Sequence, residues 1–153
     1  MIITFCGHSN FKANKNDEII LLNLLEEISK GKPIDFYLGG YGNFDLFVKN
    51  CVKKFKANHP NVNVIFVTPY LNKWLDNRKD YLKREYDKIV YPEIESVPLK
   101  FSILKRNEWM VNQADYLICY VSTHYGGAYN TLLYAHKHNK PYINLYKGDY
   151  ELY

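Results

Sequence analysis

The stretch that decides the fold of this chain reads YLICYVSTHYGGAYNT and spans residues 116–131. Its first six residues form a short apolar run rich in β-branched and aromatic side chains, which predicts a buried strand over 116–121. Gly126 and Gly127 then allow a sharp turn and a close approach of the backbone to a bound group. We expect a helix from about 128 to 138, and its first free N–H groups would form an anion site.

Strands alternate with helices through the rest of the chain. We predict further strands over 2–5, 34–38, 62–67, 89–91 and 142–145, and helices over about 17–30, 44–56 and 100–113. The polar and aromatic segment 70–87 reads as an irregular or helical excursion. This alternation predicts a single Rossmann-like α/β domain over 1–153, with a mostly parallel sheet and helices on both faces.

Composition and charge narrow the classes of function. Of the 153 residues, 47% are hydrophobic and 24% are charged, which is an ordinary globular balance. The net charge of +4 favours anionic ligands but is too small to argue for nucleic acid alone. Three dispersed cysteines predict a reduced cytoplasmic protein with buried thiols. No run approaches the roughly 20 apolar residues of a membrane span, and no histidine pair has metal-ligand spacing, so we expect no membrane contact, metal or cofactor.

Three loops are predicted to meet at the edge of the sheet where the strands end, because ligands of such sheets bind outside the carboxyl ends of the strands. The loops cover 6–10, 39–43 and 122–128. The candidate ligand contacts on these loops and on the neighbouring helices are Gly7, His8, Ser9, Asn10, Gly39, Gly40, Tyr41, Gly42, Asn43, Arg106, His124, Tyr125, Gly126, Gly127, Ala128 and Thr131.

Several of these candidates have a plain structural alternative. The glycines at 39–42 form either a second phosphate cradle or a tight turn between strand and helix. Arg106 either forks onto a ligand phosphate or carboxylate, or makes a surface ion pair. His8 and His124 either contact the ligand or hold their loops. The lysines on the polar face of the second helix are more typical of a solvated surface than of a binding patch.

Four short motifs occur in the order found in a known group of proteins. They are Cys6-Gly7-His8-Ser9, then Gly39-Gly40-Tyr41-Gly42, then Arg106 with Met110 ahead of Ala114-Asp115, and last Gly126-Gly127 with Thr131. In these motifs, and in the elements between them, the chain resembles the SLOG superfamily of Rossmann-like proteins. The resemblance is greatest to the small YpsA-like bacterial and phage branch, and it covers nearly the whole chain.

The resemblance implies that the protein binds a nucleotide or a nucleotide derivative. Some members hydrolyse the N-glycosidic bond of nucleoside 5′-monophosphates, as the LOG-type enzymes do, with an arginine and a glutamate. Arg106 fills the arginine position, but Leu133 and Tyr134 stand where the acids would be. Such hydrolysis needs a carboxylate to stabilise an oxocarbenium-like cation or to activate water. Asp45 is the best-placed substitute, although an acid in the first turn of a helix usually complements the helix dipole.

Three functions therefore compete, and the missing acid favours binding over catalysis. The first is a protein that holds a signalling nucleotide or nucleoside phosphate, as a sensor or as a sponge suited to a phage that counters nucleotide-based bacterial defence. The second is a nucleotide N-glycosidase, or phosphoribohydrolase, with a relocated acid. The third and weakest is single-stranded DNA binding, because it needs a continuous basic groove with stacking aromatics. We expect nucleic acid not to be a partner, and we expect the chain to form a homo-oligomer.

Overall fold

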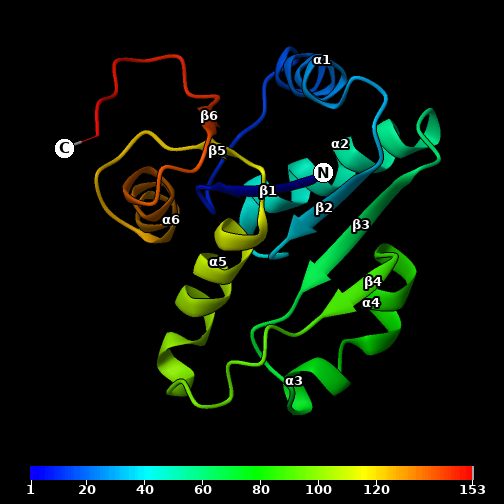
Figure 1. Ribbon diagram of the computed structural model, residues 1–153, viewed down its shortest axis with the longest axis vertical. Helices are drawn as coiled ribbons and strands as arrows, with labels where there is room; N and C mark the ends of the chain where they lie inside the picture. The colour runs from blue at the N-terminus through cyan, green and yellow to red at the C-terminus, as the bar shows by residue number, and fades with distance from the viewer. Residues whose placement is uncertain (153) are drawn as a thin grey trace.

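A computed structural model describes residues 1–152 of the chain (Figure 1). Within these residues, parallel strands form a six-stranded sheet in the order β4-β3-β2-β1-β5-β6. The strands are β1 (Ile2–Gly7), β2 (Ile34–Leu38), β3 (Val62–Val67), β4 (Lys88–Val90), β5 (Tyr116–Tyr120) and β6 (Tyr142–Asn144). The helices are α1 (Asp17–Ser29), α2 (Gly42–Ala57), α3 (Lys73–Asp76), α4 (Lys79–Glu85), the 3-10 turn η1 (Leu99–Phe101), α5 (Ser102–Gln113) and α6 (Gly127–Lys137).

This architecture confirms the predicted Rossmann-like α/β fold. Each predicted strand and helix is present, with small differences at the ends. The first strand runs two residues further than predicted, to Gly7, because Cys6 and Gly7 pair with the end of β5. The segment 70–87 folds into the short helices α3 and α4, and the helix predicted over 100–113 begins with η1 before α5.

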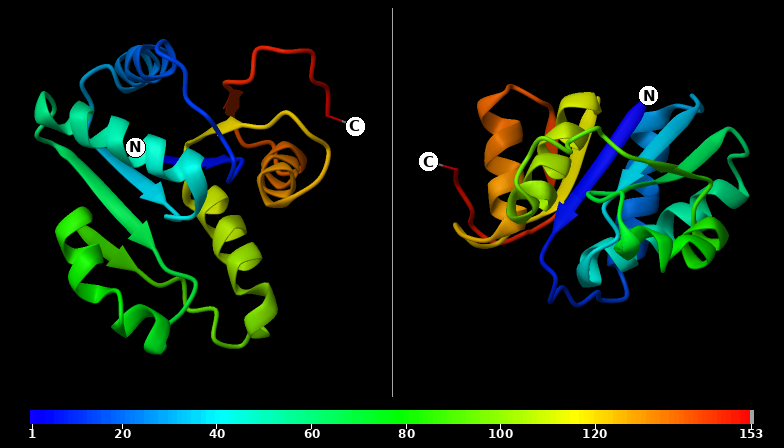
Figure 2. Two further views of the ribbon diagram at one scale, coloured as in Figure 1. Left: turned by 180° about the vertical axis from the view of Figure 1, so that it is seen from behind. Right: turned by 90° about the horizontal axis from the view of Figure 1, so that it is seen from below.

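Helices lie on both faces of the sheet (Figure 2), and alternating strand residues divide the core into two layers, one on each face. On one face, Phe36 and Phe66 pack with the buried residues of α1 and α2 and with Leu75 of α3. On the other face, Leu117 packs against the buried side of α6, and Ile65 lies against Met110 of α5. The sheet is therefore covered from both sides, and its free edge at the carboxyl ends of the strands is left to the connecting loops.

The segment after β6 returns across the loop that follows β5, as Figure 1 shows in red. The Tyr150 hydroxyl donates a hydrogen bond of 2.7 Å to the carbonyl of Thr123. This contact holds the C-terminal part of the chain against one of the predicted ligand loops. In residues 1–152, no helix combines the length and the apolar character needed to cross a bilayer.

Candidate functional site

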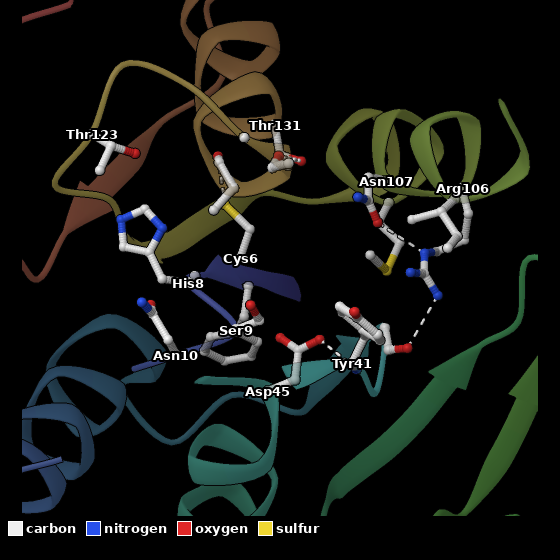
Figure 3. Close-up of a pocket in the computed structure, with 18 of the residues that line it drawn as sticks. Cys6, His8, Ser9, Asn10, Tyr41, Asp45, Arg106, Asn107, Thr123 and Thr131 are labelled. Carbon is white, nitrogen blue, oxygen red and sulfur yellow. Dashed lines mark hydrogen bonds between the residues drawn. The ribbon is translucent and has the colours of Figure 1, made fainter. Parts of the chain in front are cut away.

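The loops after β1, β2 and β5 meet at one cavity of about 570 Å³, called here the first cavity (Figure 3). Twelve of the sixteen predicted contact residues line it: Gly7, His8, Ser9, Asn10, Gly39, Tyr41, Arg106, Tyr125, Gly126, Gly127, Ala128 and Thr131. A cavity of this size suits a small molecule such as a nucleotide. The cavity therefore lies at the edge of the sheet that we predicted from the order of strands and helices.

The N-terminus of α6 opens into the first cavity without a side-chain cap. Gly126 precedes the helix with φ 92° and ψ 174°, a backbone conformation that residues other than glycine rarely adopt. A Cβ atom on Gly126 or Gly127 would meet nothing within 4 Å, so protein packing does not require a glycine at 127. Thr131 lies one turn further on, and its hydroxyl donates back to the carbonyl of Gly127 at 2.9 Å. The open space therefore faces backbone N–H groups that suit an anion.

The glycines at 39–42 are explained by packing. The Asn43 N–H donates to the carbonyl of Ser9 at 2.9 Å, and the Tyr41 N–H donates to Asp45 Oδ2 at 2.9 Å. A Cβ atom on Gly42 would lie 2.7 Å from Ser9 Cα, so the two loops touch through this glycine. Two N–H groups of this loop, those of Tyr41 and Asn43, therefore already have acceptors, and the structure favours the tight-turn interpretation.

Three predicted contacts in this region lie outside the first cavity. Gly40, Gly42 and Asn43 are absent from its lining, because the loop turns Gly39 and Tyr41 toward the cavity and Gly40 and Gly42 away from it. A Cβ atom on Gly40 would instead lie 2.7 Å from the Phe66 ring. Glycine spacing alone does not determine which side of a loop each residue faces, and the structure places these three residues outside the lining of the first cavity.

Arg106 of α5 is buried, with only 3% of its surface exposed, so it makes no surface ion pair. Its Nη1 donates to the carbonyls of Gly39 at 3.1 Å and Val67 at 2.8 Å, and its Nε donates to Asn107 Oδ1 at 2.9 Å. Burial lowers the pKa of the guanidinium to about 10, which still leaves it charged at neutral pH. Within residues 1–152 the Nη2 group has no hydrogen-bond acceptor, so it can serve a ligand in the cavity.

Asp45 is the one carboxylate in the lining of the first cavity (Figure 3). Burial raises the pKa of its side chain from 3.8 to about 6, against the opposing effects of the Tyr41 N–H and of Arg106. A carboxyl group with this pKa exchanges protons near neutral pH. Its position in the first turn of α2 was the signal that identified it in the sequence, although only as a substitute acid.

The two positions where related hydrolases carry an acid do not face the first cavity. Leu133 and Tyr134 are absent from its lining. The Tyr134 hydroxyl donates to Asn112 Oδ1 at 2.9 Å, which ties α6 to α5, and its ring stacks on His138. In this chain the two positions therefore serve contacts of α6 outside the cavity.

The two candidate histidines have different surroundings. His8 lines the cavity, and its Nε2 accepts a hydrogen bond of 2.9 Å from the Ser122 N–H. This bond requires an unprotonated Nε2, and burial lowers the pKa of the ring in agreement with it. His124 lies outside the cavity lining: its Nε2 is 2.6 Å from the Glu151 carbonyl and its ring stacks on Tyr150. The structure therefore places the His124 ring against the C-terminal segment and outside the lining of the first cavity.

Besides Asp45, the lining of the first cavity includes seven residues that we did not predict as contacts. They are Phe5, Cys6, Ile103, Asn107, Met110, Ser122 and Thr123. Ser122 and Thr123 lie within the predicted loop 122–128, and Asn107 follows Arg106. Their proximity in the sequence to the predicted contacts was therefore the available signal. Hydrogen bonding to Cys119 and burial raise the pKa of the Cys6 thiol well above its ordinary value, so this thiol is no nucleophile.

The lysines of α2 are engaged in ion pairs rather than forming a free basic patch. Lys49 and Lys53 both contact Glu85, at 2.9 and 2.8 Å. Their neighbours on the same helix, Lys54 and Lys56, contact Glu18 and Asp87. The described residues also hold no group of three or more His, Cys, Asp or Glu side chains that could bind a metal ion.

Sequence comparison finds a relative without an assigned role. The chain is 29% identical over 136 residues to the uncharacterized SPbeta prophage-derived protein YoqJ of Bacillus subtilis strain 168. The match covers 76% of this chain and 78% of that protein. No protein-family model matches the chain, so its membership of the SLOG superfamily stays a prediction.

Structure comparison finds a Rossmann-like neighbour among solved proteins. The fold matches DNA processing protein A from Helicobacter pylori, a protein with a single-stranded DNA binding mode, with a TM-score of 0.62 and 18% sequence identity. The match covers 93% of this chain but only 63% of that one, so the chain spans less than two thirds of its neighbour. At this identity the likeness establishes that the two proteins share a Rossmann-like α/β fold.

Proposed function

We propose that the first cavity binds a nucleotide-derived small ligand with a phosphate group at the N-terminus of α6. The observation that carries this proposal is the uncapped start of α6, where open space next to Gly126 and Gly127 faces a cavity of about 570 Å³. The helix dipole and the free N–H groups favour an anion there. The net charge of +4 adds a weak attraction in the same direction.

The remaining lining suits the sugar and the base of such a ligand. Asp45 offers a carboxylate oxygen to hydroxyl or amino donors, and Arg106 Nη2 offers a donor to a second acidic group. Tyr41 and Tyr125 are 71% and 75% exposed at the rim, which leaves their rings free to stack on a base. The biological role would be that of a sensor or a sponge for a signalling nucleotide. The prophage origin of the relative YoqJ agrees with the second role.

Two variants of Gly127, one charged and one neutral, test this proposal. Gly127→Glu would place a carboxylate beside the phosphate site, whereas Gly127→Gln adds nearly the same volume without charge. Thermal shift with a panel of nucleoside phosphates and cyclic dinucleotides should show stabilisation of the wild type and of the glutamine variant, and at least a tenfold loss of affinity in the glutamate variant. The proposal fails if no nucleotide raises the melting temperature of the wild type and mass spectrometry of the heated protein detects no released nucleotide.

A second candidate is N-glycosidic hydrolysis of the same ligand. It is favoured by Asp45, a carboxyl group in the cavity whose pKa of about 6 allows it to activate water or to stabilise a cationic transition state. Incubation with nucleoside monophosphates followed by chromatography should then release free base. The release should disappear in Asp45→Asn while nucleotide binding persists, and binding without any release of base would leave the protein as a binder.

A third candidate is single-stranded DNA binding, which is the binding mode of the structural neighbour from Helicobacter pylori. We predicted that nucleic acid is not a partner, and this likeness is the finding that favours the opposite. The ion pairs of the α2 lysines oppose it, because they consume the charge that a backbone-tracking groove would need. Fluorescence anisotropy with a labelled oligothymidylate at rising salt decides the matter, since DNA binding requires a steep decrease in affinity.

A further inference from the structure

A second cavity of about 250 Å³ lies on the other side of the loop that joins β2 to α2. It is bounded by α2 and by the α3–α4 segment. The Gly39–Gly42 turn separates the two cavities, with Gly39 and Tyr41 on the first and Gly40 and Gly42 on the second. Asp45 lines both cavities. The function proposed above uses only the first cavity, so the second one has no assigned role.

Aromatic side chains form most of the wall of the second cavity. Phe66, Trp74, Tyr81 and Tyr86 all line it. The Phe66 and Trp74 rings are nearly parallel, with centroids 6.3 Å apart and 21° between their planes, and the Phe66 and Tyr86 centroids are 5.3 Å apart. The Arg78 guanidinium lies 4.4 Å from the centroid of the Trp74 ring. These flat surfaces favour a flat, polarisable ligand over a branched aliphatic one.

A donor and an acceptor stand one helical turn apart in the same wall. Asp45 and Lys49 lie at positions i and i+4 of α2, so they share one face of the helix. Lys49 is 4% exposed, and its ammonium group donates to Tyr81 Oη at 3.0 Å and to Glu85 Oε1 at 2.9 Å. An ammonium group has three donors, and the partners of Lys49 in residues 1–152 use two of them. The third is left for a ligand acceptor.

We propose that the second cavity is a binding site for a nucleobase or nucleoside. Its aromatic wall would hold the plane of the ring, while Asp45 accepts from a ring N–H or amino group and Lys49 donates to a neighbouring carbonyl or ring nitrogen. Adenine, guanine, cytosine and uracil all present such an adjacent donor and acceptor on the Watson–Crick edge. The volume of about 250 Å³ suits a nucleoside better than a nucleotide chain. This site requires no phosphate, and Asp45 is the one lining residue that it shares with the first cavity.

The protein contains two tryptophans, and this permits a direct optical test. Trp74 lines the second cavity, whereas Trp109 stacks on Tyr37 at 5.7 Å and lines neither cavity. In a Trp109→Phe background, Trp74 is the single reporter. Titration with adenosine, guanosine, cytidine and uridine should show saturable quenching by at least one of the four.

Matched variants locate the binding in the second cavity. Lys49→Met should weaken quenching roughly tenfold, because a charge-assisted hydrogen bond is lost. Lys53→Met, which also removes a Glu85 partner but lies outside the cavity, should leave the affinity unchanged. Tyr81→Ala removes an aromatic wall that is 46% exposed, so the variant should fold and bind weakly even if Lys49→Met does not fold.

The same titration separates this site from the phosphate site. Gly127→Glu should weaken nucleotide binding in the first cavity at least tenfold and leave nucleoside quenching of Trp74 intact. The proposal is overturned if none of the four nucleosides gives saturable quenching, if quenching is unchanged in both Lys49→Met and Tyr81→Ala, or if Gly127→Glu abolishes it.

Discussion

Replacing Asp45 by asparagine should make the protein more stable at neutral pH. The pKa of this carboxyl rises from 3.8 to about 6 on folding, chiefly through burial. The folded state therefore holds a proton more tightly than the unfolded state, and the free energy of unfolding falls as the pH rises through the window between these two values. Each unit of pKa corresponds to about 1.4 kcal/mol, so the ionised group costs about 3 kcal/mol at pH 7. Asparagine carries no charge and can still accept the Tyr41 N–H.

Urea unfolding at pH 4, 5, 6 and 7 measures this effect directly. The stability difference between Asp45→Asn and the wild type should grow by about 2.4 kcal/mol from pH 4 to pH 7, because the unfolded carboxyl is already partly ionised at pH 4. Glu27→Gln, which removes an exposed carboxylate from α1, controls for the general loss of a negative charge and should show little pH dependence. A stability difference that stays flat with pH would refute the reasoning, because it would mean that Asp45 is not desolvated in the folded protein.

Three further substitutions test the geometry of the site. Gly7→Ala should cost about 2 kcal/mol or more in urea unfolding, because its Cβ would lie 2.2 Å from the Phe44 ring; wild-type stability would contradict the close packing of β1 on α2. Arg106→Met should cost about 3 kcal/mol or more, because two buried carbonyls lose their donor; a neutral effect would show that water replaces the guanidinium. His8→Ala should cost about 1 kcal/mol at pH 8, where neutral Nε2 accepts from Ser122. The lowered pKa of His8 means that this stabilisation is lost as the pH falls through the folded value, so a penalty that grew toward pH 5 would contradict the assignment.

The fold, and the edge of the sheet where the first cavity lies, could both be predicted from local sequence patterns. Alternating apolar runs and amphipathic segments specify a parallel α/β sheet, because hydrophobic periodicity records which backbone faces are buried. A parallel sheet brings the ends of its strands to one edge, so the loops after β1, β2 and β5 could be placed together without coordinates. The open glycines at 126 and 127 were found in the same way, since a turn followed by a helix has a local pattern.

Tertiary contacts determine which side chains face the cavity and how far their pKa values are shifted. Gly40 and Gly42 were assigned to the phosphate site from their spacing, but the path of the turn directs them to the second cavity. His124 was predicted to contact the ligand, but in the structure its ring contacts Tyr150 and the Glu151 carbonyl of the C-terminal segment. The sequence places Asp45 in the first turn of a helix, where an acid usually complements the helix dipole. Only the packing of the folded chain desolvates this carboxyl and raises its pKa. Each of these outcomes depends on contacts between residues far apart in the chain, and desolvation and loop direction leave no local pattern in the sequence.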